Sequence, residues 1–390
     1  MFDDGKEQEP LSSYLKHDFS PLGLCTKNPN SKNFWQPRFA YRKQTWSALD
    51  KLAGELLDRD VISYQAARAL SWLHENIVEN GSVCLSGRKI AVLGANAEMA
   101  STTQFLAAGA DVLWLDKVSP PKDLIDSPTR AGRLTWSEHV DLLKQPGEIL
   151  ATIIAFAGNE PIDLCLYAYA PGQARELKLT VAMNAIINTL PADLVRSITL
   201  LLSPTTATPL QESDLHAMRI RNNRRSGWEA LLTAIGLLEA QDREHNVMAS
   251  RTIVGIQGAS YQAAQYLGKL ITAESWASSG QIGKENSRPI RVSANTAAIT
   301  RTRSMEHPIF TAAFKGASAF RVETFNPDQS RCLNGLLTIH DWLRPEPPSP
   351  TLIRVHGGIH TLPYPLESAL RIAAAIGFAR SPHLLLSLLR

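Results

Sequence analysis

Short apolar runs alternate with segments of helical periodicity along the central part of the chain. The clearest apolar runs are residues 90–93, 112–115, 164–168 and 197–203. Each is too short for a helix and stops at or just before glycine, aspartate, proline or serine, as is typical of buried parallel strands. Residues 179–190 and 260–276 instead carry apolar positions at helical spacing. The alternation predicts an α/β fold with a doubly wound, mostly parallel sheet.

The part of the chain before this core has a different pattern. Residues 1–40 are polar, contain several prolines and carry scattered aromatic side chains, which favours an irregular arm on a surface. Residues 46–78 have the spacing of two helices joined near 58–63. We therefore expect an N-terminal arm with a helical extension over residues 1–85, whose role is packing or contact in a homo-oligomer.

Downstream of the core we expect further helices and strands. The expected elements are a helix at 227–241, a strand at 251–258, a strand and loop at 289–305, and a helix at 365–378. Residues 148–158 fit a strand or a helix equally well. A proline-rich linker at 343–350 separates the sheet domain, residues 86–343, from a C-terminal tail, residues 344–390.

Composition narrows the class of protein. The 390 residues carry 40 basic and 37 acidic side chains, and the formal charge of +3 is too small to predict a nucleic-acid partner. The four cysteines stand far apart, so neither a zinc site nor a disulfide framework is expected. The N-terminus is acidic and polar, and no apolar run reaches the ~18 residues of a membrane span. These features predict a cytoplasmic protein without a membrane span.

Two short motifs leave alternatives open. RIRNNRR, at 219–225, is the densest basic cluster; it fits a solvated loop or a helix start better than a phosphate or carboxylate clamp. HGGIH, at 356–360, has paired histidines, but its glycines oppose a helix and no acidic or sulfur side chain is adjacent. We therefore expect no metal site.

Residues 87–117 are the most informative segment, because they resemble the first β-α-β unit of a nucleotide-binding, Rossmann-like domain. One apolar run ends at Gly94 and the next at Asp116, where a carboxylate usually meets a ribose hydroxyl. In GxxxGxG spacing the later glycines would fall at Glu98 and Ala100. Glu98 would bring a negative charge close to a pyrophosphate. The segment therefore predicts the fold more firmly than the ligand.

From residue 87 to about 310 the order of motifs resembles a divergent member of the short-chain dehydrogenase/reductase superfamily, with degenerate glycine and Tyr/Lys motifs. The resemblance also rests on LYAYAPG at 166–172 and IRVSANTAAITRTRSM at 290–305. It implies NAD or NADP as cofactor, with NAD slightly favoured because a carboxylate at the end of the second strand repels a 2′-phosphate. The implied cofactor contacts are Gly94, Asn96, Asp116, Lys117, Ala170 and Thr296.

The same resemblance implies a tyrosine and a lysine on the helix at 260–276. Tyr261 is the candidate proton donor, and Tyr266 competes with it. Four residues after Tyr261 stands Gln265 instead of the family's lysine, and a neutral amide stabilises a phenolate far less than an ammonium does. Lys269, eight residues after Tyr261, is the remaining candidate, within reach if the helix bends or the side chain curls back.

A serine and an asparagine complete the catalytic residues that the resemblance implies. Ser203 ends a predicted strand and is preferred to Ser260, because its loop starts at the carboxyl edge of the sheet. Asn184, inside the helix after LYAYAPG, matches the asparagine of the family's water relay, although its position favours a solvent-facing or helix-packing role over that one.

Three hypotheses of function follow. The first is an NAD(P)-dependent oxidoreductase that transfers a hydride to or from a carbonyl or activated alkene of an apolar small molecule. The second is a non-redox cyclase, isomerase or hydratase on the same fold, which the residues Gln265 and Glu98 favour. The third is a catalytically inactive Rossmann-like protein that binds a partner through its terminal segments.

Overall fold

A seven-stranded sheet forms the centre of the computed structural model, which describes residues 2–3, 8–239, 249–279, 290–345 and 358–386. The strands, in spatial order, are β11 (Arg291–Thr296), β10 (Val195–Leu202), β9 (Ile162–Leu166), β6 (Lys89–Leu93), β7 (Asp111–Leu115), β8 (Leu134–Trp136) and β3 (Cys25–Lys27). All neighbours are parallel except the edge strand β3. The six parallel strands have the Rossmann order 3-2-1-4-5-6, so the predicted α/β fold is confirmed.

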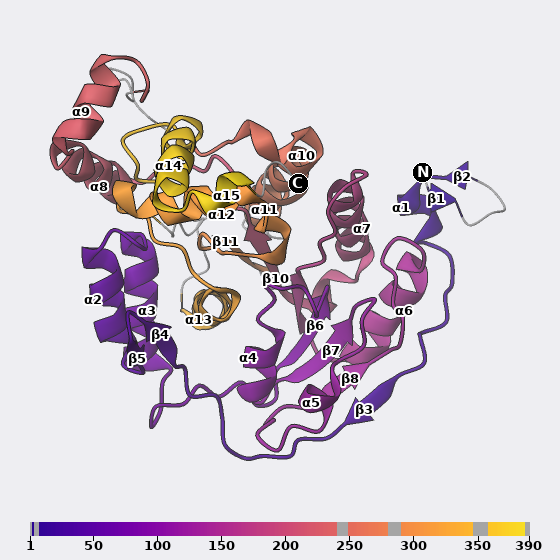
Figure 1. Ribbon diagram of the computed structural model, residues 1–390. Helices are drawn as coiled ribbons and strands as arrows, with labels where there is room; N and C mark the ends of the chain where they lie inside the picture. Colours follow the sequence, from indigo (N-terminus) through magenta and orange to yellow (C-terminus); the bar gives the residue numbers. More distant parts are fainter. Residues whose placement is uncertain (1, 4–7, 240–248, 280–289, 346–357, 387–390) are drawn as a thin grey trace.

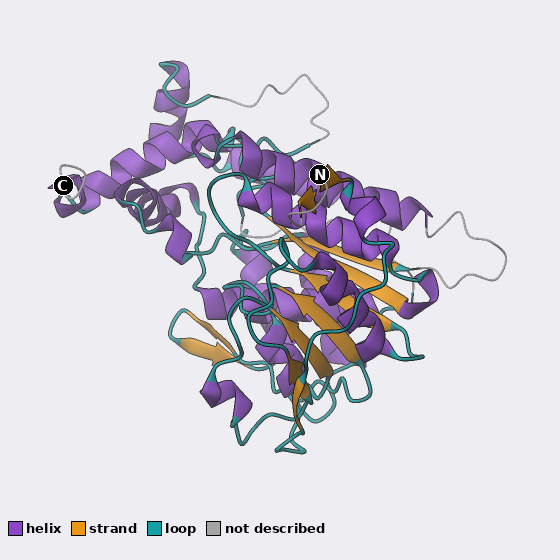
Figure 2. Cartoon of the chain, turned by 90° about the vertical axis from the view of Figure 1, so that its right-hand side faces the viewer, coloured by secondary structure: helices purple, strands orange, loops and turns teal. Residues whose placement is uncertain are grey.

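Helices cover both faces of the sheet, as Figure 2 shows. Alternate residues of β6 point to opposite faces: Ile90 and Val92 enter one buried cluster, and Ala91 and Leu93 enter the other. The first face is covered by α2 (Leu49–Asp58), α3 (Tyr64–Asn76), α4 (Thr102–Ala107) and α13 (Pro327–Leu343). The second is covered by α6 (Pro146–Ala157), α7 (Arg175–Thr189), the π-helical turn η3 (Tyr266–Leu270) and α11 (Ile271–Ser279). Helix α10 (Ala259–Gln265) packs against α7.

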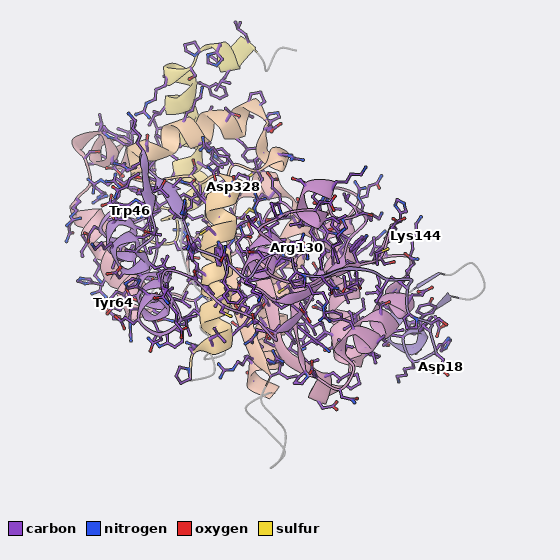
Figure 3. All side chains as sticks on the ribbon, turned by 90° about the horizontal axis from the view of Figure 1, so that it is seen from below. Asp18, Trp46, Tyr64, Arg130, Lys144 and Asp328 are labelled. Carbon is purple, nitrogen blue, oxygen red and sulfur yellow. The ribbon has the colours of Figure 1, made fainter. Side chains whose placement is uncertain are left out.

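Helix α13 lies between the sheet and the helical extension. Seen from below, Trp46 and Tyr64 of the extension lie on one side of it and Arg130 of the sheet region lies on the other (Figure 3). Because both of its sides are covered, α13 is buried along most of its length. The helical extension is thereby part of the first core, as its predicted packing role requires.

Five other helices form a separate layer at the top of Figure 1, which we call the C-terminal layer. Its helices are α8 (Glu212–Asn223), α9 (Gly227–Ala234), α12 (Pro308–Ala317), α14 (Leu366–Arg380) and α15 (His383–Leu386). Helix α14, predicted in the tail, packs against α12. Phe320, Leu362 and Tyr364 contribute to a third buried cluster in this layer.

Several details differ from the expectations. Residues 251–258 form no strand: they hold an irregular segment and one 3-10 turn, η2 (Gly255–Gln257). The N-terminal arm is not wholly irregular, since β3 extends the main sheet and β4 (Phe39–Tyr41) pairs with β5 (Gln44–Trp46). Short elements also occur elsewhere: β1 (Phe2–Asp3), β2 (Gln8–Glu9), α1 (Leu11–Tyr14) and α5 (Lys122–Ile125).

Other expectations are resolved or lie partly outside the described residues. The ambiguous segment 148–158 is helical, in α6. Helix α9 ends at Ala234, earlier than predicted, and residue 241 lies outside the described part. Residues 346–350 of the predicted linker and His356 of HGGIH also lie outside it. Within the described residues no helix is long and apolar enough to cross a membrane. The boundaries of the three parts of the chain stay a prediction.

One buried carboxylate ties three central strands together near their amino ends. Asp163 of β9 is fully buried and accepts hydrogen bonds from both Nε and Nη2 of Arg88, at 2.6 and 3.0 Å. Ser197 of β10 donates its hydroxyl to the same carboxylate at 2.6 Å, and Arg196 lies 3.3 Å away. The bidentate contact and the added hydroxyl satisfy a charge that would be costly to bury alone.

Removal of the Asp163 charge should therefore destabilise the sheet strongly. We expect Asp163→Asn to lower the free energy of unfolding by about 3 kcal/mol or more, because Arg88 and Arg196 lose their counter-ion. The matched control is Asp111→Asn, since Asp111 pairs with the half-exposed Arg133 at 3.6 Å. That change should cost under about 1 kcal/mol. Urea unfolding measures both, and equal losses would contradict the role given to Asp163.

Candidate functional site

The glycine turn after β6 lies at the point where the strand order reverses, between β6 and β9. Gly94 has a φ of +87°, which side-chain-bearing residues rarely adopt. A Cβ at this position would lie 2.2 Å from the backbone nitrogen of Ala168, just beyond β9. Gly94 is therefore required by the close approach of the two strand ends, at the edge where ligands of such sheets bind.

Asp116 uses its carboxylate within the protein. One oxygen accepts a hydrogen bond from the Asn96 N–H at 3.0 Å, and the other accepts one from the Val118 N–H, also at 3.0 Å. The neighbouring Lys117 forms an ion pair with Asp141 at 2.8 Å. Asp116 and Lys117, which were expected to select between NAD and NADP, thus bind other residues of the protein. Both lie at the carboxyl edge of the sheet, as predicted.

The place expected for a pyrophosphate is covered. The Glu98 carboxylate accepts a hydrogen bond from the Arg303 N–H at 3.2 Å, which joins the glycine turn to the loop after β11. Ser101 is fully buried and donates its hydroxyl to the Arg331 carbonyl of α13 at 2.9 Å. Ala100 and Thr102, on either side of it, are also buried.

These contacts test whether the residues present fit a dinucleotide. Such a cofactor needs free N–H groups at the start of the first helix. Here that helix, α4, has six residues and begins beneath α13, and an acidic side chain replaces a glycine in the turn before it. The residues therefore do not fit a pyrophosphate in the manner that the resemblance implies. The NAD or NADP prediction stays a prediction.

At the other end of the edge, Ser203 and Tyr261 come together. Ser203 follows the last residue of β10, and Tyr261 stands in the first turn of α10. Burial raises the pKa of the Tyr261 phenol to about 12, an effect that a hydrogen bond with the Ser203 hydroxyl partly opposes. The Ser203 hydroxyl also lies 2.7 Å from that of Thr205. The two residues that the sequence paired by analogy are thus neighbours.

Gln265 stands where the resemblance implies a lysine, and its side chain forms a hydrogen bond within the protein. Its buried side-chain oxygen accepts a hydrogen bond from the Ser203 N–H at 2.8 Å. This bond ties the end of β10 to α10 and keeps Tyr261 beside Ser203. Gln265 supplies no positive charge to the phenol, so nothing at this position lowers the pKa of Tyr261.

Lys269 does not replace the missing lysine. It lies in the π-helical turn η3, and its Nζ donates to the Leu201 carbonyl at 2.8 Å. Burial lowers the pKa of this ammonium from 10.5 to about 8. Tyr266, the competing tyrosine, hydrogen-bonds to the backbone of Ala207. Neither side chain has a contact with Tyr261 among the interactions of the described residues.

The remaining predicted residues lie around this edge without forming one cluster. Asn184 of α7 donates to the Gly268 carbonyl at 2.8 Å, so it connects two helices instead of contacting Tyr261. Ala170 follows β9 and is half-buried. Thr296 is the last residue of β11, fully buried, and pairs with Leu202 of β10. Their predicted roles at a cofactor are untested.

Two further residues complete the neighbourhood of Tyr261. Glu176, near the start of α7, is buried; one carboxylate oxygen accepts the Ser260 hydroxyl at 2.7 Å. The other oxygen is buried and has no hydrogen-bond partner in the described part of the chain. The Tyr169 ring lies 6.2 Å from the Tyr261 ring, perpendicular to it. The negative charge of Glu176 contributes to raising the pKa of both tyrosines.

Sequence reasoning missed Glu176 and Tyr169. Tyr169 belongs to the LYAYAPG motif, whose position after a buried strand was a usable signal. Glu176 carried no local signal, because its relevance comes from the packing of α7 against α10. Ser203, Tyr261 and Glu176 together provide neutral hydroxyl donors and one carboxylate with a free oxygen. Acid–base catalysis requires groups of these two kinds.

The buried Lys269 has a consequence for stability. Between pH 8 and 10.5 the folded chain has released this proton while the unfolded chain still holds it, so stability rises with pH. We expect wild type to gain about 3 kcal/mol over this range relative to Lys269→Met, since a pKa difference of one corresponds to about 1.4 kcal/mol. Urea unfolding at several pH values measures this. Lys178→Met, at an exposed position of α7, is the control and should show no such trend.

Comparison with known proteins does not assign a function to this chain, so a proposal of function depends on the residues of the site. No model of a known protein family matches the sequence, and no curated protein matches it. Among solved structures it is similar to the MalC reductase/Diels-Alderase from Malbranchea aurantiaca, with 14% sequence identity and a TM-score of 0.39. The match covers 70% of this chain and 96% of that one. A likeness of this degree carries no argument about activity, and membership of the short-chain superfamily stays a prediction.

Proposed function

We propose that the chain is an enzyme that moves protons without a hydride, as an isomerase, cyclase or hydratase does, on a small and mainly apolar carbonyl compound. The observation that carries this proposal is the cluster of Ser203, Tyr261 and Glu176 at the carboxyl edge of β10. It combines a proton donor and a proton acceptor in a buried setting, where both interact more strongly with a substrate than in water.

Tyr261 acts as the acid in this proposal. With a pKa of about 12 its phenol stays protonated at neutral pH and donates a hydrogen bond to the carbonyl oxygen. The Ser203 hydroxyl is a second donor to the same oxygen. A reductase of the family gains from a lysine that lowers the tyrosine pKa, and Gln265 stands at that position here.

Glu176 acts as the base. Its free oxygen accepts a proton from a carbon next to the carbonyl, while the electron pair of that C–H bond moves into the new C=C bond. The carbonyl oxygen takes the Tyr261 proton and becomes an enol hydroxyl. If the substrate has a second C=C bond next to the α-carbon, this species is a dienol. Glu176 then returns its proton to the far carbon of the dienol, the double bonds shift, the C=O bond re-forms and the enol hydroxyl returns its proton to Tyr261, so an isomer forms and both residues are restored without an oxidant or reductant.

The second candidate is an NAD(P)-dependent reductase, which the Rossmann strand order and the Ser203–Tyr261 pair favour. The contacts of Asp116, Glu98 and Ser101 weigh against it, because each occupies or covers a position that the cofactor would need. Titration calorimetry with NADH and with NADPH separates the candidates. We expect no binding at millimolar cofactor, whereas saturable binding of either would favour the reductase.

Proton transfer can be measured with simple probes. We expect the enzyme to exchange the α-protons of a panel of apolar ketones and 1,3-diketones for deuterium in D₂O, followed by NMR. Tyr261→Phe should lower the exchange rate about 100-fold or more, because the proton donor is lost. Tyr266→Phe is the matched control on the same helix and should keep the rate within about twofold.

The pH profile adds an independent test of Tyr261. Because the protonated phenol is the active form, exchange should persist through pH 10 and fall as the pH rises toward 12. The proposal would be abandoned if Tyr261→Phe and Tyr266→Phe had equal rates on every probe that wild type turns over.

A further inference from the structure

The dense basic motif at 219–225 borders a small pocket in the C-terminal layer, well apart in sequence from the glycine turn and unused by the proposed chemistry. The pocket is lined by Arg221, Arg224, Glu229, Phe320, Arg321, Leu362, Pro363 and Tyr364. It encloses about 250 Å³ between atoms, part of it open to solvent. The pocket as it stands has room for about one water molecule, so a larger group binds there only if the exposed Arg321 side chain moves outward. It therefore fits the end group of a ligand and not a whole molecule.

Arg221 brings a buried positive charge to this pocket. It is 4% exposed and donates to the Phe320 carbonyl at 2.9 Å, to the Thr361 hydroxyl at 2.8 Å and to the Gly358 carbonyl. All of these acceptors are neutral. Burial lowers the pKa of Arg221 to about 10, so the guanidinium stays charged at neutral pH. Its hydrogen-bond partners are thus all neutral. The charges of Asp60 and Glu229 act against the lowering of its pKa, but neither carboxylate forms an ion pair with it.

Arg321 adds a second positive charge beside the first. Its backbone is left-handed, with φ 55° and ψ 33°, a conformation that costs free energy for a residue with a side chain. Its guanidinium donates to the Arg224 carbonyl at 2.7 Å, and its charge contributes to lowering the pKa of Arg221. Among the described residues neither Arg221 nor Arg321 forms an ion pair with a carboxylate.

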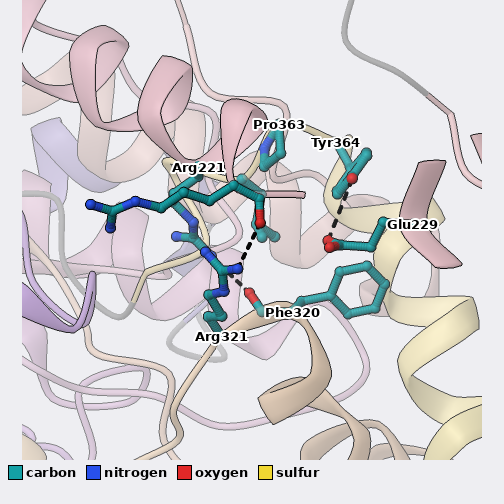
Figure 4. A pocket seen from close by; sticks show the side chains of 8 residues that line it. Arg221, Glu229, Phe320, Arg321, Pro363 and Tyr364 are labelled. Carbon is teal, nitrogen blue, oxygen red and sulfur yellow. Dashed lines mark hydrogen bonds between the residues drawn. The ribbon is translucent and has the colours of Figure 1, made fainter. Parts of the chain in front are cut away.

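The one carboxylate on the pocket is already engaged. Glu229 accepts the Ser226 N–H and hydroxyl, both at 2.7 Å, and lies 3.4 Å from the Tyr364 hydroxyl. Figure 4 shows the arginine side chains together and Glu229 with Tyr364 across the pocket from them. Because Glu229 would repel a multiply charged group, the pocket favours one that carries a single negative charge.

We propose that Arg221 and Arg321 form a binding site for a carboxylate or singly charged phosphate group of a small molecule. Such a group would accept charge-assisted hydrogen bonds from guanidinium groups that now share neutral acceptors. It would also offset the repulsion between the two like charges. The site is independent of the Ser203–Tyr261 cluster, so failure of the proposed reaction would leave it standing.

Thermal unfolding of the full chain at pH 7 tests this site. The probes are sodium acetate and sodium phosphate, each compared with sodium chloride at equal ionic strength. We expect acetate, phosphate or both to raise Tm in a saturable manner beyond the chloride effect. If only acetate acts, the site takes carboxylates; if only phosphate acts, it takes phosphate groups.

Variants separate the site from general salt effects. Arg321→Gln should weaken binding about tenfold or more, because one charged hydrogen-bond donor is lost, while Arg321→Lys should lose less. Arg219→Gln removes the same charge from an exposed residue of α8 that pairs with Glu212, and it should change binding less than twofold. A Tm gain that chloride reproduces, or an Arg321→Gln variant that responds like wild type, would overturn the proposal.

Discussion

The buried Asp163 carboxylate sets the alignment on which the functional edge of the sheet depends. Through Arg88, Ser197 and Arg196 it joins the starts of β6, β9 and β10. The parallel register carries this alignment along the strands, with Leu166 of β9 paired to Leu93 of β6 and to Leu200 of β10 near the opposite edge. The glycine turn after β6, the Tyr167–Gly172 segment after β9 and Ser203 after β10 therefore meet at one edge, about the length of a strand away from the charge that positions them.

The polar side chains in the two halves of that edge differ in their hydrogen-bond partners. Around β6 and β7, Asp116, Glu98 and Ser101 bind other parts of the chain, and α13 covers the start of α4. Around β10, Gln265 accepts a hydrogen bond from Ser203, Tyr261 lies beside Ser203, and one oxygen of Glu176 has no hydrogen-bond partner among the described residues. Glu98 and Gln265 thus have one property in common: each stands where the resemblance implies a residue that supports a dinucleotide, and each makes a contact within the fold.

The C-terminal layer extends this division of roles. Residues 358–364, which the sequence treats as part of a tail, pack against α8 and supply acceptors to the buried Arg221. Arg221 makes its hydrogen bonds to neutral oxygens and lies beside another arginine, and the carboxylates that act on its charge, Asp60 and Glu229, form no ion pair with it. The basic run at 219–225 has the sequence pattern of a solvated loop. Because its Arg221 is buried, the same run is the main support for the proposed anion site.

The sequence by itself determined the elements whose signal is local. Apolar runs with defined ends located β6, β7, β9 and β10, helical spacing located α2, α3, α7 and α14, and the order of motifs implied the Rossmann-like sheet and the pairing of Ser203 with Tyr261. The strand predicted at 251–258 was wrong. The β-branched residues of this segment suit a strand, but no neighbouring strand pairs with them. Only the tertiary structure decided that α13 covers the start of α4, that Glu176 binds Ser260 next to Tyr261, and that the charge of Arg321 acts on Arg221. Each of these depends on contacts between residues far apart in the chain, and no local periodicity or propensity encodes such a contact.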